Sequence, residues 1–276
     1  MKRVLLVDNG SLEAAGTRQL RRLATALEAR VGAKVEALSL AHSDGIASEK
    51  LDGRAAELFG PGLVRALSEG ANEIVVAPLF VGPSNAITRW LPAMIEERAK
   101  GRAGVSVKVA HPLWAPGERR LAEILADEVR AALIARGPAS AAAGAARSRV
   151  AVVDHGSPTR AVTAARDGIA AEVRELLGEA VAEVAACSME RREGPEFDFN
   201  EPTLERLLAR AEWRRGPLVV APLFIAPGRH AGPQGDVARI VKAARGDELR
   251  DVTFSRVLGE SPRLVEILAE RVRNAG

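Results

Sequence analysis

The chain has 276 residues, of which 47% are hydrophobic and 27% charged, and its 39 Lys and Arg against 36 Asp and Glu leave a net charge of +3. This composition is typical of a globular protein, and the length predicts one large domain or two of roughly 130 residues. The nearly balanced charge gives no support to nucleic-acid binding. The single cysteine, Cys187, excludes an intrachain disulfide and a thiolate zinc site.

No segment of the sequence predicts a membrane span or a secretory signal. The longest apolar run, which opens at Leu218, has roughly ten residues, about half of what a bilayer span needs. The apolar stretch at the N-terminus ends at Asp8, which is too soon for a signal peptide. We therefore expect a soluble cytoplasmic protein that binds neither nucleic acid nor membrane.

Two sequence motifs recur in the same order, which indicates a tandem duplication. The segment RVLLVDNGS begins at Arg3 and RVAVVDHGSP begins at Arg149, at an offset of 146 residues. The segment IVVAPLFVGPS begins at Ile74 and LVVAPLFIAPG begins at Leu218, at an offset of 144. Between the repeats, the small-residue segment GPASAAAGAARS has no apolar period and is typical of a linker. The predicted parts are an N-terminal domain at 1–136, a linker at 137–148 and a C-terminal domain at 149–276.

Each repeat alternates short apolar runs, which predict strands, with three- and four-residue apolar periods, which predict helices. In the first repeat, strands are expected at Arg3–Val7, Lys34–Leu40, Glu73–Leu79 and Val105–Val109. Its expected helices lie over Leu20–Val31, Leu63–Leu67, Leu91–Ala99 and Leu121–Ile134. The second repeat has strands expected near Val150–Val153, Ala182–Ala186, Leu218–Leu223 and Val252–Phe254. The fold class is therefore α/β, with two tandem α/β sandwiches, each a mostly parallel four-stranded sheet covered by helices.

Polar residues gather where the strands of the second repeat end. Because ligands bind outside the carboxyl ends of the strands in an open parallel sheet, these positions define a candidate site. The first strand leads to His155, the second to Glu190, and the third to a glycine-rich loop that carries His230. The sequence therefore predicts that two imidazoles and one carboxylate lie close together.

The first repeat lacks this pair of histidines. Asn9 stands where His155 stands, and Ala86 stands where His230 stands. The offset sets Ser43 or Asp44 against Glu190, which leaves open whether the carboxylate has a counterpart. Since both histidines are present in one repeat and absent from the other, we expect them to act as a pair.

Two imidazoles and a carboxylate can hold a borderline divalent metal such as Fe²⁺ or Co²⁺ and leave coordination positions open. Imidazole also accepts protons near neutral pH. The metallation of a tetrapyrrole requires both abilities, because a metal enters the ring as pyrrole protons leave.

The motifs VVDHGSP at Val152–Pro158 and APLFIAPGRHAGPQGDV at Ala221–Val237 resemble those of the class II chelatases that act on sirohydrochlorin, the CbiX/SirB type. The resemblance covers both halves of the chain and implies two chelatase-like domains in the long two-domain form. The N-terminal domain, which lacks the histidine pair, is then the degenerate one. The resemblance implies that His155 and His230 are the metal-handling and proton-accepting pair. Glu190 is the best match for a carboxylate that completes the metal site.

The resemblance also implies a substrate with eight carboxylates, which arginine pairs with well. The candidate substrate-binding residues are Arg191, Arg192, Arg229, Ser157 and Gly228. Other roles remain open for some of them, since Ser157 suits the cap of the following helix and Glu190 suits an ion pair with a neighbouring arginine.

The function that these observations predict is that of a lyase, a sirohydrochlorin cobaltochelatase or ferrochelatase in cobalamin or sirohaem biosynthesis. Its divalent metal is a substrate, and no organic cofactor is needed. The first alternative is a carrier that binds a metal or a tetrapyrrole without turnover, and the second is a hydrolase or transferase that uses His155 as a base. A monomer would contain both domains, and the sequence leaves a homodimer open.

Overall fold

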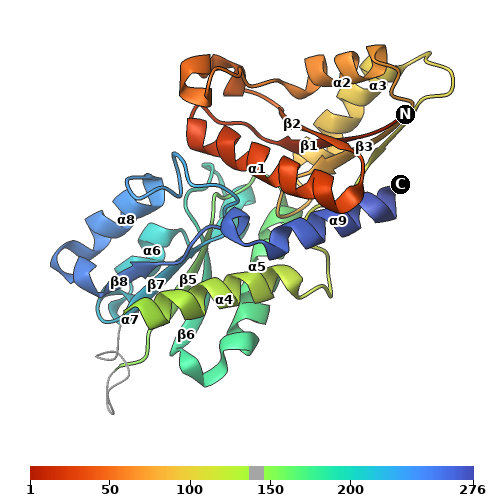
Figure 1. The fold of residues 1–276 in the computed structure, drawn as a ribbon. Coiled ribbons are helices and arrows are strands. Elements are labelled where there is room, and N and C mark those ends of the chain that lie inside the picture. The colour runs from red at the N-terminus through yellow and green to blue at the C-terminus, as the bar shows by residue number, and fades with distance from the viewer. Residues whose placement is uncertain (137–145) are drawn as a thin grey trace. The chain divides into compact units, whose positions relative to one another are not determined.

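A computed structural model describes residues 1–136 and 146–276 and contains two separate four-stranded sheets (Figure 1). The strand orders are β2-β1-β3-β4 and β6-β5-β7-β8, and every neighbouring pair is parallel. The first sheet consists of β1 (Lys2–Asp8), β2 (Lys34–Ser39), β3 (Glu73–Pro78) and β4 (Ser106–Val109). The second consists of β5 (Arg149–Asp154), β6 (Glu183–Ser188), β7 (Leu218–Pro222) and β8 (Val252–Phe254). The predicted duplicated α/β fold is confirmed, and each predicted strand is found within two residues of its expected bounds.

Helices cover both sheets. The first repeat contains α1 (Ala14–Val31), α2 (Phe59–Ser68), α3 (Leu91–Ala99) and α4 (Arg120–Ala135). The second repeat contains α5 (Arg160–Leu177), α6 (Leu204–Ala209), α7 (Ala211–Arg214), α8 (Asp236–Arg245) and α9 (Arg263–Ala275). Between β6 and α6 lies a 3₁₀ segment, Pro195–Asn200, and α3 is preceded by a π-helical turn, Ala86–Trp90.

The central strands are apolar throughout because helices cover both of their faces. In the first sheet, Leu5 and Val7 pack with Phe59 and Leu63 of α2 and with Leu91 of α3. The intervening residues of β1 are buried as well, which accounts for the continuous apolar run in the sequence. A side chain that binds a ligand therefore has no room along these strands and would have to lie where the strands end.

The two compact units of the structure do not coincide with the two sequence repeats. One unit comprises residues 1–115 and 262–276, and the other comprises residues 116–261. Helix α4, from the end of the first repeat, packs against α5 and β7, whereas α9, from the end of the second repeat, packs against α1 and β3 (Figure 1). Each unit thus takes its last helix from the other repeat, whereas the boundaries predicted at 136 and 149 follow the repeats. Most of the predicted linker, residues 137–145, lies outside the described residues.

Specific polar contacts hold each exchanged helix. Glu128 of α4 is buried, and its two carboxylate oxygens accept hydrogen bonds of 2.7 and 3.0 Å from the guanidinium of Arg256. Arg271 of α9 is also buried and donates to the carbonyl oxygens of Pro112 and Leu113, at 2.8 and 3.0 Å. Buried charges are tolerated only when they are paired or hydrogen-bonded, so these contacts fix each helix in one position.

Candidate metal and proton-transfer site

The two imidazoles of the second repeat lie together. His155 directly follows β5, and His230 lies in the loop after β7, the strand that pairs with β5. The ring centroids are 4.7 Å apart, and the rings meet edge to face. The structure therefore brings together the two side chains that the strand order predicts to be neighbours.

His230 is oriented by an acidic residue that the sequence analysis missed. Its Nδ1 donates to Oδ2 of Asp236, the first residue of α8, at 2.6 Å. Burial alone would raise the pKa of Asp236, but the hydrogen bonds from His230 and Arg239 outweigh burial and hold that pKa below its usual value. With Nδ1 bound to a carboxylate, Nε2 is the nitrogen left to bind a metal or a proton. The only feature of the sequence that could have pointed to Asp236 is its position as an acidic residue at the start of a helical pattern.

His155 is held less firmly. Its Nδ1 lies 3.1 Å from the carbonyl oxygen of Gly156, and its Nε2 lies 3.7 Å from Oε1 of Glu190. The second distance is too long for a direct hydrogen bond. In residues 1–136 and 146–276, no group of three or more His, Cys, Asp or Glu side chains has the arrangement of a metal site. Glu190 therefore lies beside one imidazole without closing a three-ligand cage.

A glycine brings Glu190 next to His155. Gly156 has a φ of +92°, and a Cβ atom there would lie 1.9 Å from the carbonyl oxygen of Glu190. The backbone N–H of Glu190 donates to the carbonyl oxygen of His155 at 3.2 Å. Only glycine allows this conformation and this approach of two backbones, which explains the glycine of the HGS motif.

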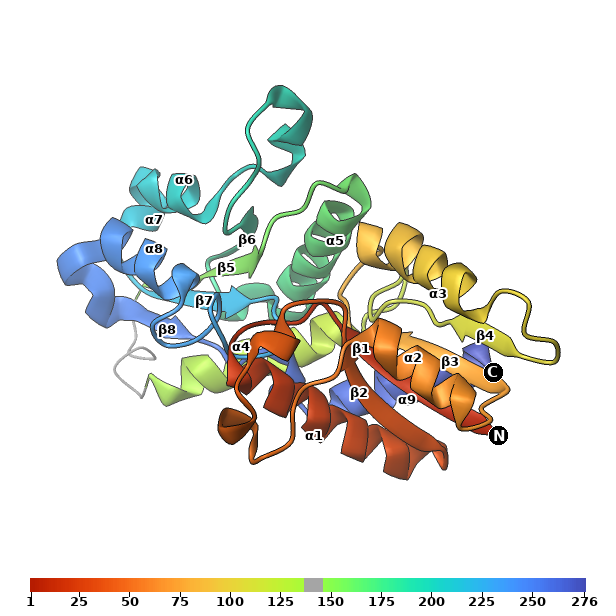
Figure 2. The same ribbon diagram turned by 90° about the horizontal axis from the view of Figure 1, so that it is seen from above.

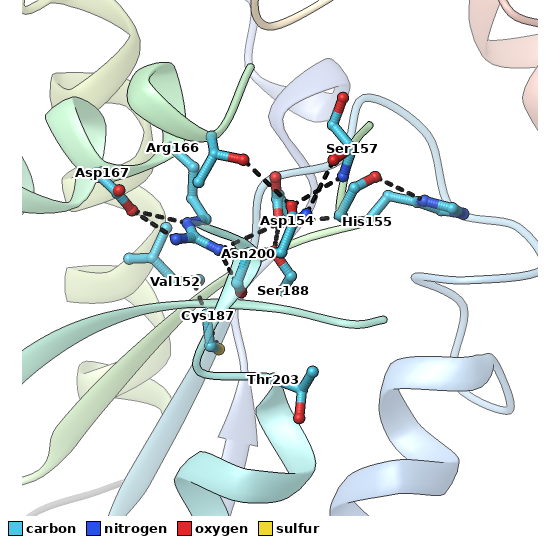
Figure 3. A network of polar contacts seen from close by, with 12 residues as sticks. Val152, Asp154, His155, Ser157, Arg166, Asp167, Cys187, Ser188, Asn200 and Thr203 are labelled. Carbon is cyan, nitrogen blue, oxygen red and sulfur yellow. Dashed lines mark hydrogen bonds and ion pairs between the residues drawn. The ribbon is translucent and has the colours of Figure 1, made fainter. Parts of the chain in front are cut away.

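A buried polar network fixes the backbone around His155 (Figure 3). Oδ1 of Asp154 accepts hydrogen bonds from the N–H of Gly156 at 3.1 Å and from the hydroxyl of Ser188 at 2.6 Å. Arg166 donates to the same hydroxyl at 2.6 Å and lies 3.8 Å from Asp154. Burial raises the pKa of Asp154, and the hydrogen bond from Ser188 and the charge of Arg166 act against this rise.

The network continues to Ser157 through Asn200. The side-chain oxygen of Asn200 accepts from the N–H of Ser157 at 3.0 Å, and its amide donates to the carbonyl oxygen of Ser157 at 2.9 Å. The hydroxyl of Ser157 accepts from the N–H of Thr159 at 3.1 Å, just before α5 begins. This contact is a local serine turn that spans two residues, and it does not cap α5, whose N-cap residue is Thr159 and has no side-chain cap. The capping role expected for Ser157 is therefore not found.

The predicted arginine anchors differ in their surroundings. Arg191 is held inside its own loop by ion pairs with Asp198 at 3.1 Å and Glu201 at 2.7 Å. The side chain of Arg229 is 74% exposed and lies 3.8 Å from Asp236. Arg192 is exposed and lies over an aromatic ring, and the carbonyl oxygen of Gly228 accepts from the N–H of Gly232 in the turn that contains His230.

The first unit repeats the backbone of this site without its two histidines and its glutamate. The N–H of Ala41 donates to the carbonyl oxygen of Asn9 at 3.3 Å, as Glu190 does to His155. The position that corresponds to Glu190 is therefore Ala41, and the alignment with Ser43 or Asp44 was wrong because the two repeats differ in length between their first and second strands.

Asp8 corresponds to Asp154, but its unit has no buried arginine beside it. Helices α1 and α5 both have 18 residues, and their common offset sets Leu20 against Arg166. Burial raises the pKa of Asp8 to about 6, although Ser39 and the N–H of Gly10 donate hydrogen bonds to its carboxylate. Between pH 3.8 and about 6, the folded state therefore binds a proton that the unfolded state releases.

The free energy of unfolding therefore falls as the pH rises from 3.8 to about 6. Asp8→Asn removes the titrating carboxyl group and is expected to abolish this fall. We expect the variant to be more stable than the parent by about 1–3 kcal/mol at pH 8 and equal to it near pH 4. Urea denaturation at both pH values measures this difference, with Asp44→Asn as an exposed control in the same unit. An equal change at both pH values would contradict the assignment.

These observations define a class of protein: a duplicated α/β fold with one pair of imidazoles at the carboxyl edge of a parallel sheet. The CbiX family model matches residues 3–132 and 149–275. The chain therefore belongs to the CbiX family, as its motifs predicted, and both repeats match the model. None of the curated protein sequences matches the chain significantly.

Solved structures share the whole fold at low sequence identity. SirB from Bacillus subtilis with Fe³⁺ has a TM-score of 0.68 and 18% identity, over 99% of this chain and 95% of that one. SirB from Bacillus subtilis subspecies spizizenii in complex with cobalt, described as a sirohydrochlorin chelatase, has a TM-score of 0.73 and 17% identity, over 99% and 94%. CbiX, described as the terminal enzyme for biosynthesis of sirohaem in denitrifying bacteria, has a TM-score of 0.60 and 19% identity over the full length of both chains.

The helices that the structure describes, in residues 1–136 and 146–276, include none with both the length and the hydropathy of a membrane span.

Proposed function

We propose that the chain is a sirohydrochlorin chelatase that inserts Co²⁺ or Fe²⁺ into the macrocycle. The observation that carries this proposal is the pair of imidazoles, 4.7 Å apart, in one repeat of a CbiX family member. The SirB structures with Fe³⁺ and with cobalt support a metal substrate of this kind. Nitrogen and oxygen ligands accept both metals, so the choice between them is left to experiment.

The reaction exchanges one divalent cation for the two protons of the pyrrole nitrogens. Nε2 of His155 and Nε2 of His230 first bind the metal, and Glu190, 3.7 Å from the former, neutralises part of its charge. As pyrrole nitrogens replace each imidazole on the metal, the freed Nε2 lone pair becomes available for a proton. Two imidazoles thus match the two protons that must leave.

Asp236 makes His230 the better proton acceptor of the two. The imidazolium that forms on protonation lies 2.6 Å from this carboxylate, which remains ionised at neutral pH because its pKa is held low. Such a pair stabilises the positive charge, whereas His155 has a carbonyl oxygen at its Nδ1. We propose that His230 accepts the first proton and that His155 chiefly delivers the metal.

The open ligand set favours metal transfer over metal storage. A carrier that retains its metal needs a closed set of ligands, and within the described residues no three-ligand group is assembled. Purified protein, sirohydrochlorin and either Co²⁺ or Fe²⁺ should give a rapid absorbance change above the rate without protein. Tight binding without a rate enhancement would instead identify a carrier, and activity independent of metal would identify a hydrolase or transferase.

Asp236→Asn is expected to lower kcat by about 10–100-fold. An asparagine amide can donate to Nδ1, which moves the imidazole proton to Nε2 and blocks the nitrogen that must bind the metal. We expect NMR to detect this change of tautomer at His230 in the variant, and Asp236→Glu to restore part of the activity. Glu212→Gln, an exposed change on α7 at the opposite end of β7, is the control. An unchanged kcat and an unchanged His230 tautomer in Asp236→Asn would refute the positioning role.

A further inference from the structure

Two arginines of the second unit lie over two neighbouring phenylalanine rings. Cζ of Arg192 lies 5.8 Å from the ring centroid of Phe197, and Cζ of Arg160 lies 4.6 Å from that of Phe199. The two phenylalanine centroids are 6.3 Å apart, with their planes tilted by 60°. The four side chains, Arg192, Phe197, Phe199 and Arg160, therefore form one continuous group, which we call the arginine–phenylalanine array.

The array belongs to the loop between β6 and α6, which projects from the second unit in Figure 2. Arg192 is two residues beyond Glu190, and Arg160 is five residues beyond His155 at the start of α5. Asn200 ties this loop to the backbone after His155, because its amide donates to the carbonyl oxygens of both Phe197 and Ser157, at 3.2 and 2.9 Å. The array is thus hydrogen-bonded to the segment that carries the first imidazole.

The two guanidiniums of the array have no carboxylate partner among the residues that the structure describes. Arg191, between Glu190 and Arg192 in sequence, is by contrast neutralised by Asp198 and Glu201. Arg160 and Arg192 are exposed, and both phenylalanines are half-buried. A cation on an aromatic face is partly ordered yet keeps its N–H donors free for an anion.

The array occurs only in the repeat that carries the imidazole pair. The common offset of α1 and α5 sets Ala14 of the first repeat against Arg160. The first-repeat segment between β2 and α2, residues 40–58, contains no Phe, Tyr or Trp. A purely structural role would serve both copies of the fold equally, so the array is associated with the site.

We propose that the arginine–phenylalanine array binds a planar, conjugated polycarboxylate, with the guanidiniums on peripheral carboxylates and the phenylalanine faces against the ring edge. This inference rests on the proposed function and names the part of the chain that selects its tetrapyrrole. Separated guanidiniums match carboxylates spread around a macrocycle, and bidentate arginine–carboxylate pairs are strong and directional. A small anion would engage neither the second arginine nor the aromatic faces.

The test is the binding of a metal-free tetrapyrrole, followed by the quenching of its fluorescence. The probes are sirohydrochlorin and uroporphyrin, a second planar octacarboxylate, so that binding is measured without metal insertion. We expect Arg160→Ala and Arg192→Ala each to raise Kd about tenfold and the double variant to raise it about a hundredfold, with a weaker dependence on salt. Arg214→Ala, an exposed change on α7, is the matched control and should leave Kd unchanged.

The double change Phe197→Leu and Phe199→Leu keeps every charge and is expected to raise Kd about threefold to tenfold. Unfolding midpoints of the arginine variants should equal that of the parent, because both arginines are exposed. An unchanged Kd in the arginine double variant, or a wild type that binds neither probe, would overturn the proposal. If the probes bind in a way that depends on the array but no metal is inserted, the binding role of the array is supported and only the chelatase function is refuted.

Discussion

His155→Ala and His230→Ala are each expected to lower kcat/KM for metal insertion by about 10²–10⁴-fold, the usual range for the loss of a proton-transferring group. The two variants should differ in kind. His155→Ala is expected to act mainly on the KM for the metal, because this imidazole lies beside Glu190, 3.7 Å away. His230→Ala is expected to act mainly on kcat, because this imidazole has the Asp236 carboxylate at 2.6 Å.

Initial rates at several metal concentrations separate the effect on KM from the effect on kcat. The chain has four histidines, and His111→Ala, an exposed change in the first unit, is the control. Added imidazole should restore part of the activity of His230→Ala. Full activity in either variant of the pair would refute the mechanism, since no other histidine of the second repeat exists to replace it.

The repeat and the neighbouring strands could be predicted from the sequence because each depends on a simple physical regularity. A parallel sheet covered on both faces requires continuous apolar runs, and those runs recur at nearly constant offsets. Residues after adjacent parallel strands meet at one edge of the sheet, so His155 and His230 were predicted to be neighbours and are found 4.7 Å apart.

The exchange of α4 and α9 was beyond prediction because the two helices present the same apolar pattern. Leu121 and Leu125 on one helix and Leu264 and Leu268 on the other have the same four-residue spacing, and all four are buried. Such spacing shows which face of a helix is covered but not which sheet covers it.

The polar partners of the site were missed for a related reason. The contact of Asp236 with His230 and the contacts of Asn200 depend on the conformations of two loops. Loops have no periodic apolar pattern from which their conformation could be predicted. The counterpart of Glu190 was misassigned because an offset taken from strands does not hold across loops of unequal length.

The divergence between the copies separates the requirements of the fold from those of the site. Asp8 and Asp154, with Gly10 and Gly156 two residues later, occur in both repeats and form the same turn. The imidazoles, Glu190 and the arginine–phenylalanine array occur in the second repeat alone. The shared residues shape the end of the strand, and the unshared residues carry the proposed chemistry.

Gly156→Ala and Gly10→Ala form a matched pair of variants that tests this separation. Both glycines have positive φ, +92° and +84°, and a Cβ atom would lie 1.9 Å from the carbonyl oxygen of Glu190 and 1.8 Å from that of Ala41. Each alanine must push two backbone segments apart, and we expect each variant to lose about 3 kcal/mol or more of stability. Urea denaturation at constant temperature measures this loss, which should be similar for the two variants.

Their activities should differ. In Gly156→Ala, the displaced segment carries His155 and Glu190, so we expect at least a tenfold fall in kcat/KM under conditions where the protein is folded, in addition to its lower stability. In Gly10→Ala, the displaced segment carries Asn9 and Ala41, and the folded protein should keep the parent activity. Equal losses of activity in the two folded variants would mean that the first repeat shares in the reaction, and the assignment of the chemistry to the second repeat alone would then be wrong.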